Sequence, residues 1–371
     1  MIVGIDARAA AEVPAGRGRL VRELLVALGA LDTPHRFRLF CREPWNEVEL
    51  GPRLEWVPMA LPDPLWHARV AVEANRGCDV FFSTNSYLTA WMVRVPCVVL
   101  VHDLIAFLPD APANQRSARI ERATIRPAIR RAAGLVCYSR STERDLIRFF
   151  PRATGRTAVI PLAAEKRFHR QRSAAELDAL TGRFGVQPDG FVFATGTLEP
   201  RKNLLRLIRA HSELTPDLRD RHPLLIAGPR GWEEHAIMKA AEDSKHVKLA
   251  GFVPDEDLAG LYAACAVFAY PSLYEGFGLP VLEAMAAGAA VVTSDVSSLP
   301  EVGGGDVAYV QPEDEHSITL ALDQLLTDPR ERAALGERAR LRAAGFSWEQ
   351  VASGMLGQLE LAASSARPAA G

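Results

Sequence analysis

The chain has 371 residues, of which 48% are hydrophobic and 24% are charged, and its formal net charge is −2. This length favours about two domains of ordinary soluble composition, and the near-neutral charge gives no indication of nucleic-acid binding. The five cysteines are scattered without a C-x-x-C pair, which argues against a disulfide framework and a structural zinc site and for a reducing compartment.

The first residues, MIVGID, resemble the start of a strand and lack the basic leader and cleavage site of a secretory signal. No apolar run in the sequence reaches the ~18 residues that cross a bilayer. We therefore expect a cytoplasmic protein that could touch the inner face of the membrane without crossing it.

Short apolar runs alternate with longer helical patterns along the whole chain, which is typical of βαβ units and parallel sheets. The first series of predicted strands covers residues 2–5, 36–40, 80–82, 97–101, 134–138 and 157–160. The second series covers residues 191–195, 224–227, 247–249, 267–269 and 290–293, with helices predicted at 19–28, 204–214, 257–264 and 280–287.

Two such series predict two doubly wound domains, and ligands bind such domains at the carboxyl ends of the strands. We predict an amino-terminal domain over residues 1–165 and a second domain over residues 166–346. A helix over residues 347–362 should pack back on the first domain, and residues 363–371 should form a flexible tail. The predicted site is the cleft between the domains.

Several polar groups of the first domain follow predicted strands. Gly16 and Gly18 precede the first long helix, but their spacing is not a dinucleotide fingerprint. His102 and Asp103 end a buried strand. Either pair could also be structural.

Five arginines are spaced 3, 3, 4 and 4 residues apart, so on a helix they form one basic stripe: Arg116, Arg119, Arg122, Arg126 and Arg130. Such a stripe would suit anionic lipids or a lipid-diphosphate acceptor. We favour the plainer explanation, a solvated helix face. The sequence gives no indication of an oligomeric state.

The segment TGTLEPRKN, residues 195–203, lies between a predicted strand and a helix. Gly196 opens the turn, and Arg201 and Lys202 follow at the helix entrance. Two fixed cations there can neutralise a diphosphate without a metal ion.

A second segment, PSLYEGFGLPVLEAMAAG at residues 271–288, contains Glu275 and Glu283 around a glycine elbow. Gly278 lets the backbone approach a ligand, and Pro280 suits the first position of a helix. The amino terminus of that helix would attract an anion, while carboxylates accept hydrogen bonds from sugar hydroxyls. Phosphate and hydroxyls together indicate a nucleotide sugar.

These two segments resemble the motifs of the retaining glycosyltransferases of family 4, which have the GT-B fold of two facing Rossmann-like domains. The resemblance implies that Glu275 and His102 lie near the donor sugar, that Glu283 holds the ribose hydroxyls, and that Arg201 and Lys202 grip the pyrophosphate. The further donor contacts that it implies are at Gly16, Gly18, Gly196, Phe252, Val253, Phe277, Gly278 and Leu279. Asp103 falls on the acceptor side.

The resemblance also implies transfer of a hexose, with a preference for mannose, from a GDP-, UDP- or dTDP-sugar to a saccharide, lipid-linked or natural-product acceptor. We expect no cofactor and no metal ion. Asp255 and Asp257 match an Asp-x-Asp pattern, but their place at a predicted helix start favours capping. A nucleotide-sugar epimerase or hydrolase on the same fold, and a non-catalytic saccharide-binding protein, remain alternatives.

Overall fold

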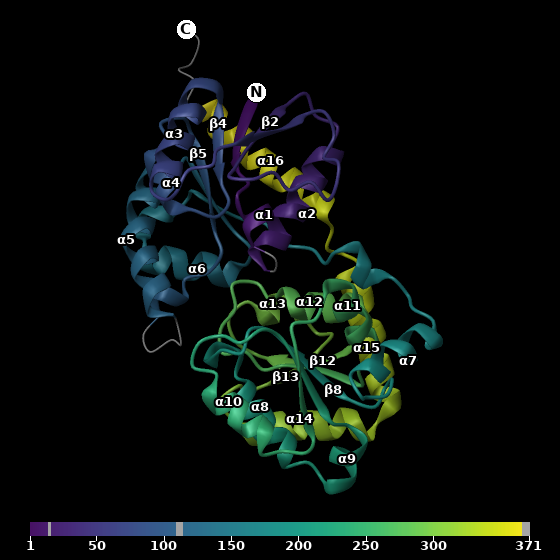
Figure 1. Ribbon diagram of the computed structural model, residues 1–371. Helices are drawn as coiled ribbons and strands as arrows, with labels where there is room; N and C mark the ends of the chain where they lie inside the picture. Colours follow the sequence, from purple (N-terminus) through teal and green to yellow (C-terminus); the bar gives the residue numbers. More distant parts are fainter. Residues whose placement is uncertain (14–15, 109–113, 366–371) are drawn as a thin grey trace. The chain divides into compact units, whose positions relative to one another are not determined.

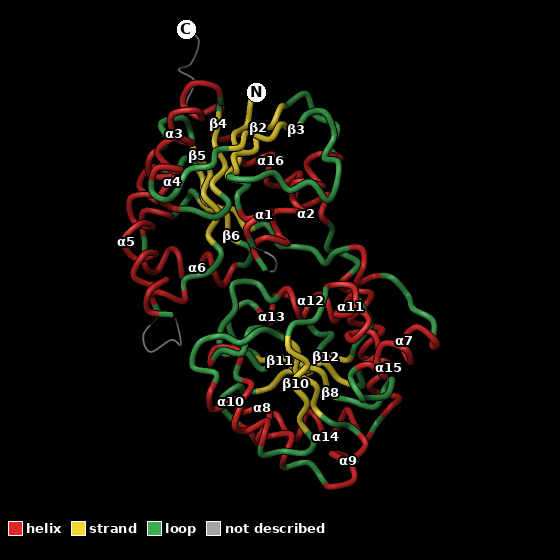
Figure 2. Tube along the Cα trace, viewed as in Figure 1, coloured by secondary structure: helices red, strands yellow, loops and turns green. Residues whose placement is uncertain are grey.

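The computed structural model describes residues 1–13, 16–108 and 114–365 (Figure 1). It divides into two compact units. Unit 1 contains the described residues of 1–162 together with 347–365, and unit 2 contains residues 163–346. In each unit a central sheet is covered by helices (Figure 2).

The sheet of unit 1 has seven parallel strands in the order β3-β2-β1-β4-β5-β6-β7. The strands are β1 (Ile2–Asp6), β2 (Arg36–Cys41), β3 (Leu54–Pro58), β4 (Val80–Ser83), β5 (Cys97–Val101), β6 (Gly134–Cys137) and β7 (Thr157–Val159). The helices are α1 (Ala9–Glu12), α2 (Arg17–Ala30), α3 (Leu65–Gly77), α4 (Tyr87–Met92), η1 (Ile105–Phe107), α5 (Gln115–Arg131), α6 (Arg140–Phe149), η2 (Pro151–Ala153) and α16 (Trp348–Ser365).

The central strands of unit 1 form because they are continuous apolar runs. Every residue of β4, β5 and β6 is buried, as expected for a parallel sheet covered on both faces. Strand β3, which the sequence analysis missed, lies at the sheet edge, and only Leu54 of its five residues is buried. An edge strand of this kind lacks the apolar run by which the others were predicted.

Helix α16 returns the end of the chain to unit 1, where it packs against α2 and strands β4, β5 and β6. Its packed face contains Val351, Met355 and Leu359, which follow the helical period of about four residues. The helix continues to Ser365, three residues past the predicted limit at 362, and residues 366–371 of the predicted tail lie outside the described part of the chain.

The sheet of unit 2 has six parallel strands in the order β10-β9-β8-β11-β12-β13. The strands are β8 (Val192–Thr195), β9 (Leu224–Ala227), β10 (Val247–Gly251), β11 (Val267–Tyr270), β12 (Ala290–Ser294) and β13 (Ala308–Val310). The helices are η3 (Lys166–His169), α7 (Ala174–Arg183), η4 (Pro200–Lys202), α8 (Leu204–Ser212), α9 (Pro216–Arg221), α10 (His235–Glu242), α11 (Asp255–Ala264), α12 (Leu279–Ala286), α13 (Leu299–Gly303), α14 (Glu315–Thr327) and α15 (Pro329–Ala343).

Each sheet has one point where the strand order reverses. In unit 1 the reversal lies between β1 and β4, and in unit 2 it lies between β8 and β11. At such a point, the loops that follow the two neighbouring strands run to opposite sides of the sheet. They leave a crevice at the carboxyl ends of the strands, where ligands of doubly wound sheets bind. In unit 2 these loops are residues 196–203 and 271–278, the two segments identified in the sequence.

Candidate functional site

The loop after β8 is built to present two cations. Gly196 has φ +132°, a left-handed conformation that side chains rarely adopt, and the short helix η4 then carries Arg201 and Lys202. Asn203 ends η4 at φ +58° and donates from Nδ2 to the carbonyl oxygens of Pro271 (2.9 Å) and Pro312 (2.6 Å). The loop is therefore fixed to the segment that follows β11.

Further hydrogen bonds join the same two loops. The Leu273 amide and the Ser272 hydroxyl both donate to the carbonyl oxygen of Arg201, at 2.9 and 3.0 Å. Two segments about 70 residues apart in the sequence are thus held side by side, which brings Arg201, Lys202 and Glu275 together.

The Glu275 carboxylate is the centre of this cluster. Its Oε1 accepts from Lys202 Nζ (2.7 Å), Ser272 Oγ (2.7 Å) and Tyr270 Oη (2.8 Å), and its Oε2 pairs with Arg201 Nη1 at 2.7 Å. The side chains of Lys202 and Glu275 are 9% and 10% exposed. Lys202 Nζ also contacts the Tyr270 hydroxyl.

Burial and the surrounding charges determine how these groups titrate. Burial alone would raise the pKa of Glu275, but Arg201, Lys202 and the hydrogen bonds outweigh it and lower that pKa to about 2. Burial, with the neighbouring Arg201 charge, lowers the pKa of Lys202, while Glu275 opposes that shift. Glu275 is therefore an ionised, fully paired carboxylate at neutral pH.

Arg201 lies between two carboxylates. Its Nε and Nη2 donate to Glu199 Oε1 at 3.0 and 2.7 Å, while Nη1 reaches Glu275 and the Tyr274 carbonyl oxygen. Glu199 in turn accepts at Oε2 from Trp232 Nε1 (3.2 Å). The two predicted cations thus belong to a network with two carboxylates, in which Lys202 and Glu275 are buried and Arg201 and Glu199 are partly exposed. The sequence does not predict this pairing.

Helix α12 begins at Leu279, so Pro280 occupies its second position and not the first position predicted for it. Gly278 is the residue before the helix, at φ +107°, and a Cβ there would come within 2.7 Å of Leu299 Cδ2. Both constraints favour glycine in the elbow. Phe277, next to it, is buried and packs edge-on against Phe346.

Glu283 lies in the second turn of α12 and is 3% exposed. Its Oε2 accepts from the hydroxyl of Tyr262, a fully buried residue of α11, at 3.2 Å. Glu283 is thus held by a hydroxyl of α11, whereas Glu275 is held by Arg201, Lys202 and two nearby hydroxyls. Phe252 and Val253 follow β10, and the Phe252 ring is 63% exposed while Val253 is buried.

In unit 1, His102 follows β5 and its Nε2 donates to the carbonyl oxygen of Thr84 at 2.8 Å. A carbonyl can only accept, so Nδ1 is the unprotonated nitrogen. Burial, with Arg17 nearby, lowers the pKa of His102 to about 4, which leaves the ring neutral at pH 7. Asp103 Oδ1 accepts from the Ile105 amide (3.1 Å) at the start of η1.

The predicted glycine loop divides into two different roles. Gly16 precedes α2 at φ +55°, is exposed, and has open space around its Cβ position. Gly18 lies inside α2, where a Cβ would come within 1.7 Å of the Val13 carbonyl oxygen. Gly18 therefore permits the close packing of α2 on the segment after α1, which accounts for this glycine without a ligand.

The five arginines of the basic stripe lie on the single helix α5, which continues through Pro127, and all five are exposed. Ile125 and Ile129 of the same helix are buried, while Ile120 is 60% exposed. No helix in the described part of the chain combines the length and the apolar composition needed to cross a bilayer.

Asp255 and Asp257 lie in the first turn of α11, and Asp257 pairs with Arg183 at 2.5 Å. Among the described residues, no three histidine, cysteine or acidic side chains are arranged to hold a metal ion.

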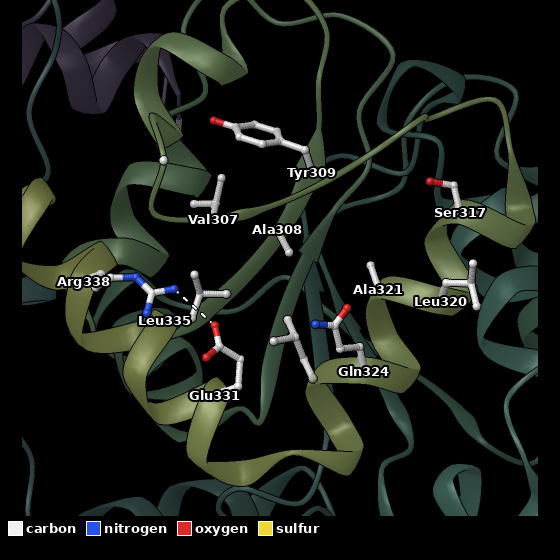
Figure 3. A pocket seen from close by; sticks show the side chains of 12 residues that line it. Val307, Ala308, Tyr309, Ser317, Leu320, Ala321, Gln324, Glu331, Leu335 and Arg338 are labelled. Atoms are coloured by element: carbon white, nitrogen blue, oxygen red, sulfur yellow. Dashed lines mark hydrogen bonds and ion pairs between the residues drawn. The ribbon is translucent and has the colours of Figure 1, made fainter.

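A pocket of about 390 Å³ lies along the edge strand β13 between α14 and α15, with Tyr309, Gln324 and Arg338 among its lining residues (Figure 3). The lining includes no residue predicted to bind a donor, and the pocket is not at the carboxyl ends of β8 and β11. We therefore assign the site from the charged network and not from this pocket.

Tyr270, Ser272, Glu199 and Trp232 are site residues that the sequence analysis did not assign. Tyr270 and Ser272 lie within or next to the quoted motif, and their nearness to Glu275 was a usable signal. Glu199 and Trp232 are 33 residues apart, and only the packing of the two loops brings them together.

Comparisons with known proteins show that both units match models of glycosyltransferase families. A family model described as Glycosyltransferase Family 4 matches residues 14–165, and a model described as Glycosyl transferases group 1 matches residues 185–342. The similar relatives include two mannosyltransferases from Escherichia coli. The O-antigen chain mannosyltransferase B is 34% identical over 274 residues, which cover 73% of this chain and 71% of the relative.

The serotype-specific mannosyltransferase WbdA is 35% identical over 228 residues, which cover 60% of this chain but only 28% of that longer protein. Among solved structures, sucrose-phosphate synthase from Thermosynechococcus elongatus aligns with a TM-score of 0.78 at 22% identity over 99% of this chain and 100% of that one. Anabaena HepE in complex with UDP-glucose aligns with a TM-score of 0.77 at 18% identity over 97% and 99%.

Proposed function

The chain belongs to glycosyltransferase family 4 and has the GT-B fold, and we propose that within this family it transfers mannose from GDP-mannose to a saccharide acceptor, with retention of configuration. The Arg201–Lys202–Glu275 network at the carboxyl ends of β8 and β11 carries the proposal. The named mannosyltransferases at 34% and 35% identity support the choice of sugar.

The network suits a leaving diphosphate. Cleavage of the sugar–phosphate bond gives an oxocarbenium-like sugar and concentrates negative charge on the phosphate. Lys202 is buried and the Arg201 side chain is 21% exposed, and both are held by ion pairs, so these positive charges need little reorganisation as that charge develops. We propose that they take over this role without a metal ion, aided by the amino terminus of α12.

Glu275 is a poor candidate for a nucleophile in a double displacement. Its oxygens are paired with two cations and two hydroxyls, and its pKa is lowered to about 2. Such a carboxylate is weakly basic and strongly held. We therefore propose that it orders the two cations beside the donor sugar, while the departing phosphate oxygen takes the acceptor proton on the same face.

On unit 1, the unprotonated Nδ1 of His102 can accept a hydrogen bond from a sugar hydroxyl. We propose that Glu283 accepts from the ribose hydroxyls and that the exposed Phe252 ring lies against the base. The Glu283 carboxylate is buried and already accepts a hydrogen bond from Tyr262. Ribose binding would therefore require it to accept hydrogen bonds from Tyr262 and from the nucleotide together.

We propose that the acceptor is a growing surface polysaccharide, in line with the name of the O-antigen relative. The exposed basic stripe of α5 is favoured above as a solvated face, but it would also suit an anionic carrier of that polysaccharide. Cosedimentation with vesicles containing anionic lipid, compared with neutral vesicles, tests this point. Equal recovery in the two pellets would assign the stripe to an ordinary solvated face.

The function is tested by incubating the protein with GDP-mannose and mannose-terminated oligosaccharides and following the reaction by NMR. We expect an extended oligosaccharide with an α-mannosyl linkage, because GDP-mannose is itself α-linked. A β linkage would contradict retention. Release of free mannose without extension would indicate a hydrolase, and reaction only with a UDP- or dTDP-sugar would overturn the proposed donor.

A further inference from the structure

The loop after β9 packs along the cation loop after β8 and extends the sheet beyond its last regular hydrogen bonds. The amides of Gly196 and Leu198 donate to the carbonyl oxygens of Ala227 and Pro229, each at 3.0 Å. Leu198 and Arg230 then form an isolated parallel bridge.

Two glycines make this close packing possible. A Cβ at Gly228, which has φ +151°, would come within 2.0 Å of the Gly196 carbonyl oxygen. A Cβ at Gly231 would come within 2.6 Å of the Leu198 carbonyl oxygen. Because any larger side chain would force the loops apart, the backbone of residues 228–231 has a fixed position against residues 196–198.

Trp232 and Glu199 lie at the end of this paired segment. The Trp232 indole N–H donates to Glu199 Oε2 at 3.2 Å, and Glu199 Oε1 accepts from both Nε and Nη2 of Arg201. The Glu199 side chain is only 15% exposed. One oxygen of this carboxylate therefore faces the indole and the other grips one edge of the guanidinium.

The other side of the Arg201 guanidinium, at Nη1, faces the proposed site of the reaction. Nη1 points away from the edge held by Glu199 and donates to Glu275 Oε2 (2.7 Å) and to the Tyr274 carbonyl oxygen (3.1 Å). If the guanidinium were held only at Nη1, the long arginine side chain could still adopt several rotamers. The bond at the Nε edge removes that freedom before any donor arrives.

We propose that Glu199, fixed by Trp232, is a positioning residue that holds Arg201 in register for the donor diphosphate. Its grip on Nε and Nη2 persists whether Nη1 donates to Glu275 or to a phosphate oxygen. Glu199 does not itself contact the donor, since a carboxylate beside a diphosphate would repel it. The inference rests on the proposed function, because it concerns the pyrophosphate contact of Arg201.

The test is the variant Glu199→Gln, which keeps the size of the side chain but removes its charge. We expect kcat/KM for GDP-mannose to fall about 10- to 100-fold, since small misplacements of a charged group near the reacting bond have effects of this order. Trp232→Phe should lower kcat/KM in the same direction by a smaller factor. Glu233→Gln, at an exposed position of the same loop, is the matched control and should leave kcat/KM unchanged.

A double-mutant cycle separates positioning from a structural role. In an Arg201→Ala background there is no guanidinium to orient, so Glu199→Gln should change kcat/KM less than about twofold. Independent, multiplicative losses would overturn the proposal, as would wild-type kcat/KM in Glu199→Gln itself. Absence of turnover in the unmodified protein with every nucleotide sugar would instead contradict the proposed function. Circular dichroism of each variant confirms that the fold is retained.

Discussion

Removal of the Lys202 ammonium tests the charged network at its most buried cation. Lys202 is 8% exposed, and Nζ lies 2.7 Å from Glu275 Oε1 and against the Tyr270 hydroxyl. Lys202→Ala leaves Glu275 with one cation, Arg201, and with the Ser272 and Tyr270 hydroxyls. The diphosphate at the same time loses one of the two charges that would stabilise its departure.

The two consequences have different sizes. Loss of one well-placed stabilising group typically lowers kcat by about 10²- to 10³-fold, so we expect a fall of at least ~10²-fold in turnover. Stability should fall by only about 1–3 kcal/mol, because Glu275 keeps Arg201 and two hydroxyl donors and is not left as an isolated buried charge. The protein should therefore fold normally and yet turn over poorly.

The assay is the steady-state rate with GDP-mannose, measured beside thermal unfolding of each variant. Lys202→Met is the matched control for lost packing, since methionine refills much of the volume without charge. It should lose less stability than Lys202→Ala, because only the charge is lost, but it should be as inactive as Lys202→Ala. Near-normal turnover in either variant would show that Lys202 has no catalytic role. If both variants were inactive because they unfold, an electrostatic role for Lys202 would have no support.

Three other predictions follow from the described contacts. Glu283→Ala should weaken nucleotide binding, followed by calorimetric titration, more than Glu275→Ala does, and equal or reversed losses would contradict the ribose assignment. Gly18→Ala should destabilise unit 1 by about 1–3 kcal/mol in denaturant unfolding, because its Cβ would overlap the Val13 carbonyl oxygen, and an unchanged midpoint would refute that packing argument. His102, with its pKa lowered from 6.5 to about 4, should stabilise the fold above pH 6.5 and lose that contribution as the pH falls towards 4; a proton NMR titration midpoint near 6.5 would contradict this.

Much of the fold was predictable because the inner strands of a parallel sheet are buried on both faces. Strands β4, β5, β8 and β11 are continuous apolar runs, and the sequence predicted each within a few residues. Strands β3 and β13 were missed, although β7 and β10, which lie at the other two sheet edges, were predicted. Strand β3 contains Glu55 and ends at Pro58, and β13 has only three residues, so neither forms an apolar run of the usual length.

The sequence predicted the position of the site better than it predicted which residues form the site. Strand ends and motif spacing were enough to place Arg201, Lys202 and Glu275 near one another. Whether cations face a ligand or a carboxylate depends on side-chain geometry, so the pairing of Glu275 with both cations had no signal in the sequence. The contact between Glu199 and Trp232 depends on the close approach of two loops, which local patterns do not encode.

Gly18 illustrates a related limit. A glycine beside a helix start has the same appearance in sequence whether it admits a phosphate or a neighbouring carbonyl group. Only the 1.7 Å approach to Val13 distinguishes the two explanations. In contrast, the left-handed φ of Gly278 agrees with the elbow inferred from its motif, because a tight turn before a proline-containing helix start restricts the backbone locally.

The proposed nucleotide site can be tested by measuring the thermal stability of the wild type and Lys202→Met with GDP, UDP, dTDP and ADP, in the presence of Mg²⁺ or of a chelator. At 100 times its Kd a nucleotide that binds only the folded state adds about 2.7 kcal/mol, which corresponds to a rise of several degrees in Tm. We expect GDP to give the largest rise in the Tm of the wild type. The chelator should not abolish this rise, and Lys202→Met should reduce it. A wild-type Tm that no nucleotide raises, or a rise that Lys202→Met leaves intact, would contradict a nucleoside-diphosphate site at Arg201, Lys202 and Glu275.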